Sequence, residues 1–340
     1  MITRIRIKNY RSFVDAEVKL RSFSLVVGAN GSGKSNLLRF LSLLEDAPGE
    51  DPLLGQTYPI IFEPKRLWTF HTNHPIDNIG FEVDLISTAG QNYTIEAHSE
   101  FPEEKLFLSD VFPWEEASIP WFTLNPEAIS SPELIISKAT VGADGSGTAQ
   151  VLESLKSGDR EDLFLKIEKS FRQYVPEIEK LSLRTVDEGK KQIQVRERGL
   201  NELLPATELS EGTRLILCIL TIIHQERPPP IILLEDIDRG LHPRLFEYMA
   251  PLMKDIAERH NINILATTHN PYLVDCFKDD KEAVIIVEKK DGVSTLSTLA
   301  DRLEGLDYDS VDPDDMPLGN LWFSGLVGGV PAKITRRPEK

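Results

Sequence analysis

Cysteine is scarce in this chain of 340 residues, which contains only Cys218 and Cys276. Two cysteines form neither a disulfide framework nor a cysteine-rich metal site. Cys218 lies inside an apolar run, and Cys276 lies between Asp275 and Phe277. We therefore expect two structural thiols in a protein that works in a reducing compartment.

Long apolar runs are also missing. The longest stretch, Leu215 to Ile223, is too short to span a bilayer as a helix. Arg4, Arg6, Lys8 and Arg11 interrupt the first residues, where a secretory signal would need an unbroken apolar segment. We expect a cytoplasmic protein that makes no membrane contact.

Positive charge is too rare for a surface that binds nucleic acid everywhere, because the net charge is −16. Local basic clusters remain, and each is either a solvated face or a DNA contact, which leaves DNA open as a partner. These clusters are Arg4, Arg6, Lys8 and Arg11; Lys190, Lys191, Arg196 and Arg198; and Lys333, Arg336, Arg337 and Lys340. The sequence also has no internal repeat and no heptad run, which excludes a long coiled-coil arm.

The segment GANGSGKS, Gly28 to Ser35, follows the apolar run Phe23–Val27 and precedes the amphipathic stretch from Asn36 to Glu45. A glycine-rich turn between a buried strand and a helix start predicts a phosphate loop, in which backbone N–H groups surround the β-phosphate. Lys34 is expected to reach the β- and γ-phosphates, and the Ser35 hydroxyl to hold Mg²⁺. The nucleotide contacts expected around them come from Asn30, Gly31, Ser32, Gly33 and Asn36. The alternative is a glycine turn that binds nothing.

Three later segments carry further candidates. Ile231 to Leu234 predicts a buried strand that ends in Glu235 and Asp236, at the edge where α/β sheets bind ligands. Such acidic strand ends are common, so this signal gains weight only beside a phosphate loop.

Leu209–Ser210–Glu211–Gly212–Thr213 opens an apolar helix, where Ser210 is an N-cap, a phosphate ligand together with the Gly212 N–H, or both. His269 follows the buried strand Ile262–Ala266 and is either a turn residue or a catalytic one.

The remaining pattern predicts strands and helices that alternate after the phosphate loop, hence a largely parallel α/β sheet with antiparallel hairpins at its edge. We expect hairpins over Thr3–Leu20 (turning near Tyr10–Ser12), Gly80–Ala97, Leu181–Val195 and Ala283–Leu296. Helices are expected over Asp159–Tyr174 (capped by Asp159), Glu211–His224 and Pro243–His260, and a loosely ordered tail over Leu306–Lys340. Most of residues 47–78 and 98–147 shows no clear period.

The order of these segments resembles that of the ABC-type ATPases, and more narrowly the RecF/SMC/OLD-like branch found in DNA repair and phage defence. The resemblance rests on Asn9–Tyr10–Arg11–Ser12–Phe13, GANGSGKS, LSEGT (Leu209–Thr213), EDIDRGLHP (Glu235–Pro243) and TTHNP (Thr267–Pro271). It implies a P-loop NTPase fold with an ABC-type head, a mostly parallel sheet, an antiparallel β edge subdomain and a small helical lobe. The expected arrangement is one head over 1–340. Residues 1–46 hold the first hairpin and phosphate loop, 47–200 an insert, 201–300 the signature and acidic-strand core, and 301–340 a tail.

The resemblance also implies a composite site, in which two heads enclose two ATP molecules and Ser210 contacts the γ-phosphate bound to the other subunit. His269 matches the switch histidine of the family, and Arg11 and Ser12 match positions close to the nucleotide. Counting back from Leu241 places Asp236 at the catalytic base and Glu235 at the Mg²⁺ position. The family often has Asp then Glu here, so a shorter base and slow turnover are expected.

The function that follows is an ATPase that dimerises on ATP and controls a partner effector, such as a nuclease or toxin, in DNA repair or antiviral defence. About 70 residues follow His269, fewer than an ordinary domain of roughly 100–200, so we expect an isolated head without a nuclease domain. Two alternatives stay open: the ATPase subunit of a membrane transporter, and a small-molecule kinase. The kinase would share the phosphate loop but would need neither LSEGT nor a serine acting across subunits.

Overall fold

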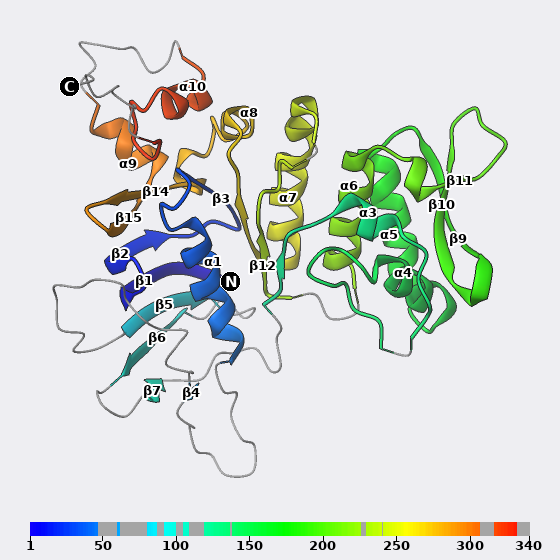
Figure 1. Ribbon diagram of the computed structural model, residues 1–340, viewed down its shortest axis with the longest axis horizontal. Helices are drawn as coiled ribbons and strands as arrows, with labels where there is room; N and C mark the ends of the chain where they lie inside the picture. Colours follow the sequence, from blue (N-terminus) through cyan, green and yellow to red (C-terminus); the bar gives the residue numbers. More distant parts are fainter. Residues whose placement is uncertain are drawn as a thin grey trace, which may run out of the picture. The chain divides into compact units, whose positions relative to one another are not determined.

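The computed structural model describes residues 1–46, 60–61, 80–86, 92–99, 105–108, 119–136, 138–225, 229–239, 241–306 and 316–331. These form two compact units, the first from Met1–Glu116 and Thr267–Lys340 and the second from Ala117–Ala266 (Figure 1). Within the described ranges, every helix is too short or too polar to cross a membrane. The α/β class expected from the sequence is confirmed.

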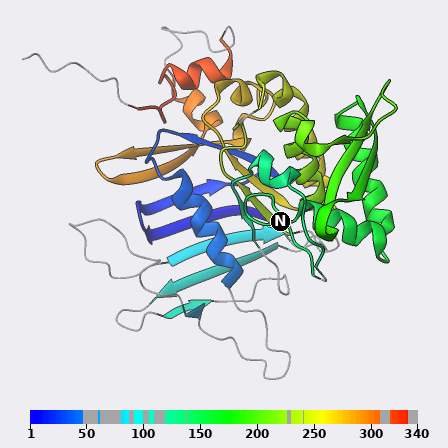
Figure 2. The ribbon, with the colours of Figure 1, turned by 45° about the vertical axis from the view of Figure 1, so that its right-hand side comes forward.

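The first unit contains an antiparallel sheet with the strand order β2-β1-β5-β6-β7-β4. Its strands are β1 (Ile2–Tyr10), β2 (Phe13–Lys19), β4 (Ile60–Ile61), β5 (Gly80–Ile86), β6 (Asn92–Ser99) and β7 (Lys105–Leu108). Helix α1 (Lys34–Ser42) lies across this sheet (Figure 2). Phe40 of α1 packs edge-on against Tyr10 of β1 and Phe81 of β5, with ring centroids 5.6 and 5.4 Å apart. Aromatic packing of this kind fixes the helix that follows the phosphate loop.

The strand before the phosphate loop, β3 (Phe23–Gly28), is buried along its whole length. It pairs in parallel with β14 (Val284–Lys290), and β14 continues into the antiparallel partner β15 (Val293–Thr298). Strand β15 also packs near β2, and helix α9 (Leu299–Glu304) follows it behind a complete capping box of Thr298 and Asp301. The loop thus leaves the carboxyl end of a core strand, as predicted.

The end of the chain differs from the sequence-based expectation. Residues 316–331 are packed, and the prediction of a loosely ordered tail is wrong for them. Helix α10 (Leu318–Phe323) packs on α8 (Pro271–Asp275), and the Gly319 N–H donates to the Asp275 carboxylate at 2.7 Å. The side chains of Leu321 and Trp322, which belong to α10, are buried. Glycines 325, 328 and 329 looked like a flexible composition, but here they make left-handed turns that fold the segment back on β14.

The second unit contains parallel strands in the order β13-β12-β8, namely β8 (Trp121–Phe122), β12 (Ile231–Leu234) and β13 (Asn263–Thr267), which ends at the unit boundary. Its helices are α3 (Pro126–Ser130), α4 (Thr148–Ser157), α5 (Glu161–Tyr174), α6 (Glu211–Ile223) and α7 (Phe246–His260). Helices α4 and α5 pack on a small antiparallel sheet, whose order is β11-β10-β9. That sheet comprises β9 (Ile178–Thr185), β10 (Lys191–Glu197) and β11 (Leu204–Pro205).

Most predicted elements are confirmed to within a few residues, including the pairing of Leu183 with Ile193 and of Leu181 with Val195. The Asp159 cap is wrong. Helix α5 begins at Glu161, and the cap position is held by Arg160, whose side chain bonds to Asp162 and makes no capping hydrogen bond. Glu161 and Asp162 lie in the first turn, where acidic groups offset the positive end of the helix dipole. The segment expected as one helix from Pro243 begins as a 3₁₀ turn, Pro243–Leu245, and continues as α7.

Candidate nucleotide site

The phosphate loop owes its shape to its glycines. Gly31 and Gly33 have φ angles of 75° and 120°, which side chains other than that of glycine rarely tolerate. A Cβ on Gly28 would come within 2.3 Å of the Val287 carbonyl oxygen, so β14 and the loop approach too closely for any side chain. Gly31, by contrast, would meet nothing within 4 Å, which leaves this side of the loop open.

The polar groups of the loop fit a phosphate. The Lys34 ammonium is buried and donates to the carbonyls of Gly28 and Ala29 at 2.8 and 3.1 Å, so it already spans the loop. The Ser32 hydroxyl is buried and makes no hydrogen bond within the described part of the chain. Helix α1 begins at Lys34 with no side-chain cap, and the positive end of a helix attracts an anion.

The β1–β2 turn brings Arg11 and Ser12 to this loop. Arg11 has a φ angle of 50°, and its guanidinium donates to the Asn36 side-chain oxygen at 3.2 Å. The Asn36 amide in turn donates to the Ser12 hydroxyl at 3.0 Å. Three residues that the sequence proposed as nucleotide contacts therefore form one hydrogen-bonded group beside the first turn of α1.

Sequence reasoning missed a fourth member of this group, Ser294 on β15. Its N–H donates to the Ser12 carbonyl at 2.7 Å, and its hydroxyl donates to the Ser32 carbonyl at 2.5 Å. Ser294 is fully buried. Ser294 is a polar residue at an inward position of a hairpin, which could have singled it out. The nearby Thr295 and Ser297 are also polar, so the sequence alone does not distinguish Ser294 from them.

His269 lies in the segment after β13. The preceding Thr268 N–H donates to the Val26 carbonyl of β3 at 3.2 Å, which holds the backbone beside the strand that leads into the phosphate loop. The His269 side chain is exposed. Asn270 then accepts from the Tyr272 N–H at 3.0 Å and caps α8. The backbone that leads to His269 is therefore held beside β3.

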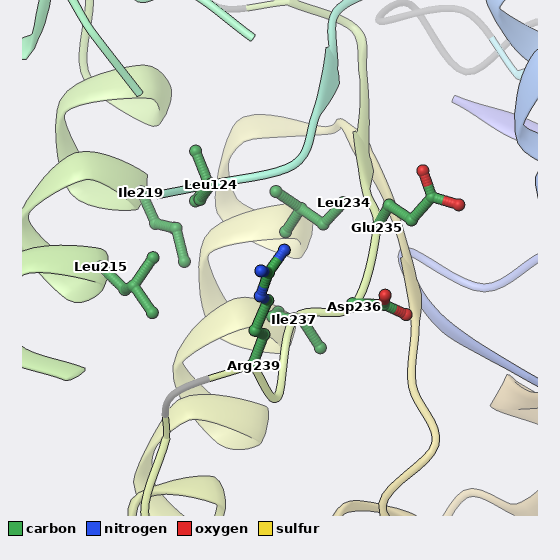
Figure 3. Close-up of a pocket in the computed structure, with 8 residues that line it drawn as sticks. All are labelled: Leu124, Leu215, Ile219, Leu234, Glu235, Asp236, Ile237 and Arg239. Carbon is green, nitrogen blue, oxygen red and sulfur yellow. The ribbon is translucent and has the colours of Figure 1, made fainter. Parts of the chain in front are cut away.

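In the second unit, Glu235 and Asp236 end β12 as predicted. Figure 3 shows both carboxylates on one side of the strand, turned away from an apolar cluster of Leu124, Leu215 and Ile219. The Glu235 N–H donates to the Phe122 carbonyl at 2.8 Å, and the Asp236 carbonyl accepts from the Arg239 N–H at 2.9 Å. Asp236 has a φ angle of 50°, a left-handed conformation that is uncommon outside glycine and that asparagine and aspartate adopt most readily.

The signature segment begins α6 in the way the sequence predicted. The Ser210 hydroxyl accepts from the Thr213 N–H at 3.1 Å and lies 2.8 Å from the Thr213 hydroxyl. Gly212 is buried against Leu241 and Leu245. A Cβ at this position would come within 2.5 Å of Leu245 and 3.0 Å of Leu241, so a larger residue would not fit. Ser210 itself is exposed, so its hydroxyl can face a ligand as well as cap the helix.

Within the described residues, no three carboxylate, histidine or cysteine side chains gather into a metal site. The predicted pair of a Ser35 hydroxyl and a Glu235 carboxylate offers oxygen ligands only, which suits Mg²⁺, an ion that keeps several waters and takes its other oxygens from phosphates. Ser35 belongs to the first unit and Glu235 to the second.

Three members of the first basic cluster pair with carboxylates. Arg4 contacts Asp84 at 2.6 Å, Arg6 contacts Asp15 at 2.8 Å, and Lys8 contacts Glu82 at 3.0 Å. Hydrogen bonds from Arg4 lower the pKa of Asp84, and those from Lys8 lower the pKa of Glu82. In the second cluster, Lys191 and Arg196 pair with Glu153 and Glu179. The third cluster lies outside the described residues.

Comparison with known families covers both units. A model described as "AAA ATPase domain" matches residues 1–112, and one described as "AAA domain, putative AbiEii toxin, Type IV TA system" matches residues 143–275. A curated relative, the OLD nuclease of Thermus scotoductus, is 22% identical over 345 residues. The match covers 86% of this chain, and the chain spans 63% of the length of that relative.

Solved structures share the fold. The SMC head bound to the C-winged helix domain of ScpA matches with a TM-score of 0.57 and 14% identity, over 87% of this chain and 97% of that one. The SMC head domain from Thermotoga maritima matches with a TM-score of 0.51 and 16% identity, over 87% and 98% of the two chains. With these matches and the sequence motifs together, the chain is an ATPase whose two units are similar to AAA-type ATPase domains and to the ABC-type heads of the RecF/SMC/OLD-like branch.

Proposed function

We propose that this ATPase is a switch: two copies close head to head around two ATP molecules, and the closed dimer controls a partner effector. The observation that carries the proposal is the capped, exposed Ser210 at the start of α6. A helix start whose serine hydroxyl caps the Thr213 N–H and is still exposed suits a phosphate held by another subunit.

The phosphate loop of each copy binds one ATP in this proposal. Lys34 exchanges its two carbonyl partners for β- and γ-phosphate oxygens, and the N–H groups of residues 30–35 surround the β-phosphate. Arg11, Ser12 and Asn36 contact the nucleotide from the β1–β2 turn and α1. Ser210 and the Gly212 N–H of the other copy contact the γ-phosphate.

Asp236 accepts the proton of the attacking water, and His269 orients that water or the γ-phosphate. Ser35 and Glu235 would hold Mg²⁺, which would neutralise charge on the phosphate oxygens. Loss of the γ-phosphate removes the contact with Ser210. A hydrogen bond to a charged group contributes about 1.5–3 kcal/mol. Two such contacts per dimer would therefore change its dissociation constant by a factor of at least about 100.

The partner that we propose is a nuclease or toxin that acts in DNA repair or antiviral defence. The support is the names of the relatives: one matching model is described as a putative toxin domain, and the curated relative is an OLD nuclease. An SMC head among the structural matches is bound to a protein partner, ScpA. DNA is a candidate ligand of the assembled complex.

Light scattering of the purified protein tests the dimer directly. We expect a monomer without nucleotide and a dimer with ATP and Mg²⁺ in the slow-turnover variant Asp236→Asn. Ser210→Arg should remain a monomer with ATP although it still binds one nucleotide per chain, because the long side chain fills the space of the γ-phosphate. A matched control is Ser131→Arg, since that serine is exposed and lies at the end of the short helix α3.

The outcomes separate the functions. ATP-dependent dimers in the Ser210→Arg variant would refute the contact between subunits. A monomer under all conditions, with a phosphorylated small molecule as product, would favour the kinase. Membrane proteins that co-purify in stoichiometric amounts would favour the transporter subunit.

A further inference from the structure

We propose that Ser294 is a positioning residue for the phosphate loop, and that it orients the Gly33 N–H toward the bound nucleotide. This inference rests on the phosphate loop being the nucleotide site, as proposed above. No sequence motif includes Ser294, which lies 262 residues from its acceptor Ser32.

Ser294 acts on the loop through the peptide unit between Ser32 and Gly33. The Ser294 hydroxyl donates to the Ser32 carbonyl at 2.5 Å and directs it toward β15. A trans peptide is planar, and its C=O and N–H groups point in opposite directions. Holding the carbonyl toward β15 therefore points the Gly33 N–H away from β15. This N–H is one of the consecutive donors that a phosphate loop presents to its ligand.

The space around Gly33 supports the same reasoning. A Cβ on Gly33 would lie 2.8 Å from the Ser294 hydroxyl and 3.2 Å from both the Ser294 Cβ and the Ser12 hydroxyl. Gly33 also has a φ angle of 120°. Gly33 and Ser294 are therefore in close contact, and the loop has little room to rotate this peptide while the hydroxyl is in place.

Ser294 also fixes the β1–β2 turn. Its N–H donates to the Ser12 carbonyl at 2.7 Å, while the Ser12 hydroxyl accepts from the Asn36 amide at 3.0 Å. Arg11, which precedes Ser12, is held in a left-handed conformation with a φ angle of 50°. One buried residue on β15 thus bonds to two segments that are both expected to contact ATP, and it sets their relative position.

The substitution Ser294→Ala removes the hydroxyl and keeps the backbone N–H. We expect the dissociation constant for ATP, measured by calorimetry with Mg²⁺, to rise about fivefold, the effect of one ordinary hydrogen bond. The turnover number should stay within about twofold and the KM should rise, because the Gly33 N–H binds the phosphate equally in the ground and transition states. Hydrogen exchange of residues 28–36 should be faster than in the wild type.

A matched control is Ser24→Ala. Ser24 is also fully buried in the same unit, but within the described ranges its hydroxyl bonds to the backbone of Arg21 and not to the phosphate loop. We expect it to lower the melting temperature by about as much as Ser294→Ala and to leave ATP affinity unchanged. If Ser294→Ala is too unstable to assay, Ser294→Cys takes its place, since it keeps a similar volume and a weaker donor.

An unchanged ATP affinity in Ser294→Ala would overturn the inference, and so would an equal loss of affinity in Ser24→Ala. Lys34→Ala distinguishes a failure of the proposed nucleotide site from a failure of the role of Ser294. If it binds ATP like the wild type, the phosphate loop is not the nucleotide site and the proposed function fails. If it loses ATP binding while Ser294→Ala retains wild-type affinity, only the role of Ser294 fails.

Discussion

Asp236 combines a predicted catalytic role with an uncommon backbone conformation, and substitutions can separate the two. Its φ angle is 50°, and its backbone carbonyl accepts from the Arg239 N–H at 2.9 Å. Asparagine has nearly the same shape and accepts left-handed conformations as readily as aspartate. Asp236→Asn therefore removes the carboxylate with little change in the turn. Alanine at the same φ angle is less favourable by about 1 kcal/mol, and glycine is not.

Stability and turnover should then rank the variants differently. We expect Asp236→Asn and Asp236→Gly to melt near the wild-type temperature and Asp236→Ala to melt roughly 3 °C lower. Loss of a general base lowers the rate by a factor of about 10² to 10⁴, so hydrolysis should fall that far in all three variants. That loss corresponds to about 3–5 kcal/mol of activation free energy.

The assay is phosphate release under single-turnover conditions, with differential scanning fluorimetry on the same samples. Asp255→Asn serves as a control, since it removes one carboxylate from a surface pair with Arg259 in the same unit. A wild-type rate in Asp236→Asn would refute the assignment of the base. A loss of activity that follows melting temperature across the series would show that the turn, and not the carboxylate, is what matters.

Three further predictions concern the rest of the molecule. Gly329→Val should lower the melting temperature by roughly 5 °C, because the residue has a φ angle of 72° and its Cβ would come within 2.6 Å of Ile286; Gly189→Val, with a φ angle of 78° and nothing within 4 Å, should lower it less. Burial lowers the pKa of His224 and His260 below the ordinary value of 6.5, so on acidification the unfolded chain takes up protons at a higher pH than the folded chain does. The free energy of unfolding, measured by urea titration, should therefore fall as pH drops from 7 to 5, and it should fall less steeply in His224→Gln. The pKa of Asp84 is lowered by Arg4, so that pair stabilises the fold above the ordinary value of 3.8 and its contribution is lost as pH falls through the folded-state pKa. Asp84→Asn should be less stable than the wild type by at most about 1 kcal/mol at pH 7, a difference that shrinks in acid and is absent if the pair contributes nothing.

Elements that depend on local sequence were predictable. The apolar run that forms α6 directly follows its cap residue Ser210, so both are visible in one short stretch of sequence. The structure has the helix and its cap where the sequence predicted them. The hairpin of β9 and β10 has its predicted register, with Leu183 opposite Ile193 and Leu181 opposite Val195, because a slip by one residue would move these apolar side chains to the other face of the sheet.

Elements that depend on distant contacts were not predictable. The segment around α10 has an acidic and glycine-rich composition that suggests loose order. Its glycines instead allow backbone contacts, since a Cβ on Gly319 would come within 2.1 Å of the Pro271 carbonyl. A segment has the same amino-acid composition whether its glycines confer flexibility or permit close packing. Only the partner segment, which lies elsewhere in the sequence, distinguishes them.

The same division applies inside the candidate site. Phosphate-binding N–H groups must be consecutive, so the loop from Gly28 to Ser35 forms a recognisable motif. The residue that orients one of those groups can come from any strand that passes nearby. Ser294 orients the Gly33 N–H through a hydrogen bond to the Ser32 carbonyl, 262 residues away in the sequence. The residues around Ser294 form no motif that would predict this bond.

Left-handed backbone conformations show which parts of the candidate site are set by local geometry. In the described part of the chain, the non-glycine residues with positive φ angles are Asn9, Arg11, Asp236, Asn261 and Asp291. Three of these have ordinary structural causes, since Asn261 ends α7, Asp291 forms the β14–β15 turn with Gly292, and Arg11 forms the two-residue β1–β2 turn with Ser12. Asn9 and Asp236 are residue types that adopt this conformation readily. The hairpin turn thus sets the positions of Arg11 and Ser12 beside Asn36 through local backbone geometry, and the bonds of Ser294 and Asn36 to Ser12 hold it there.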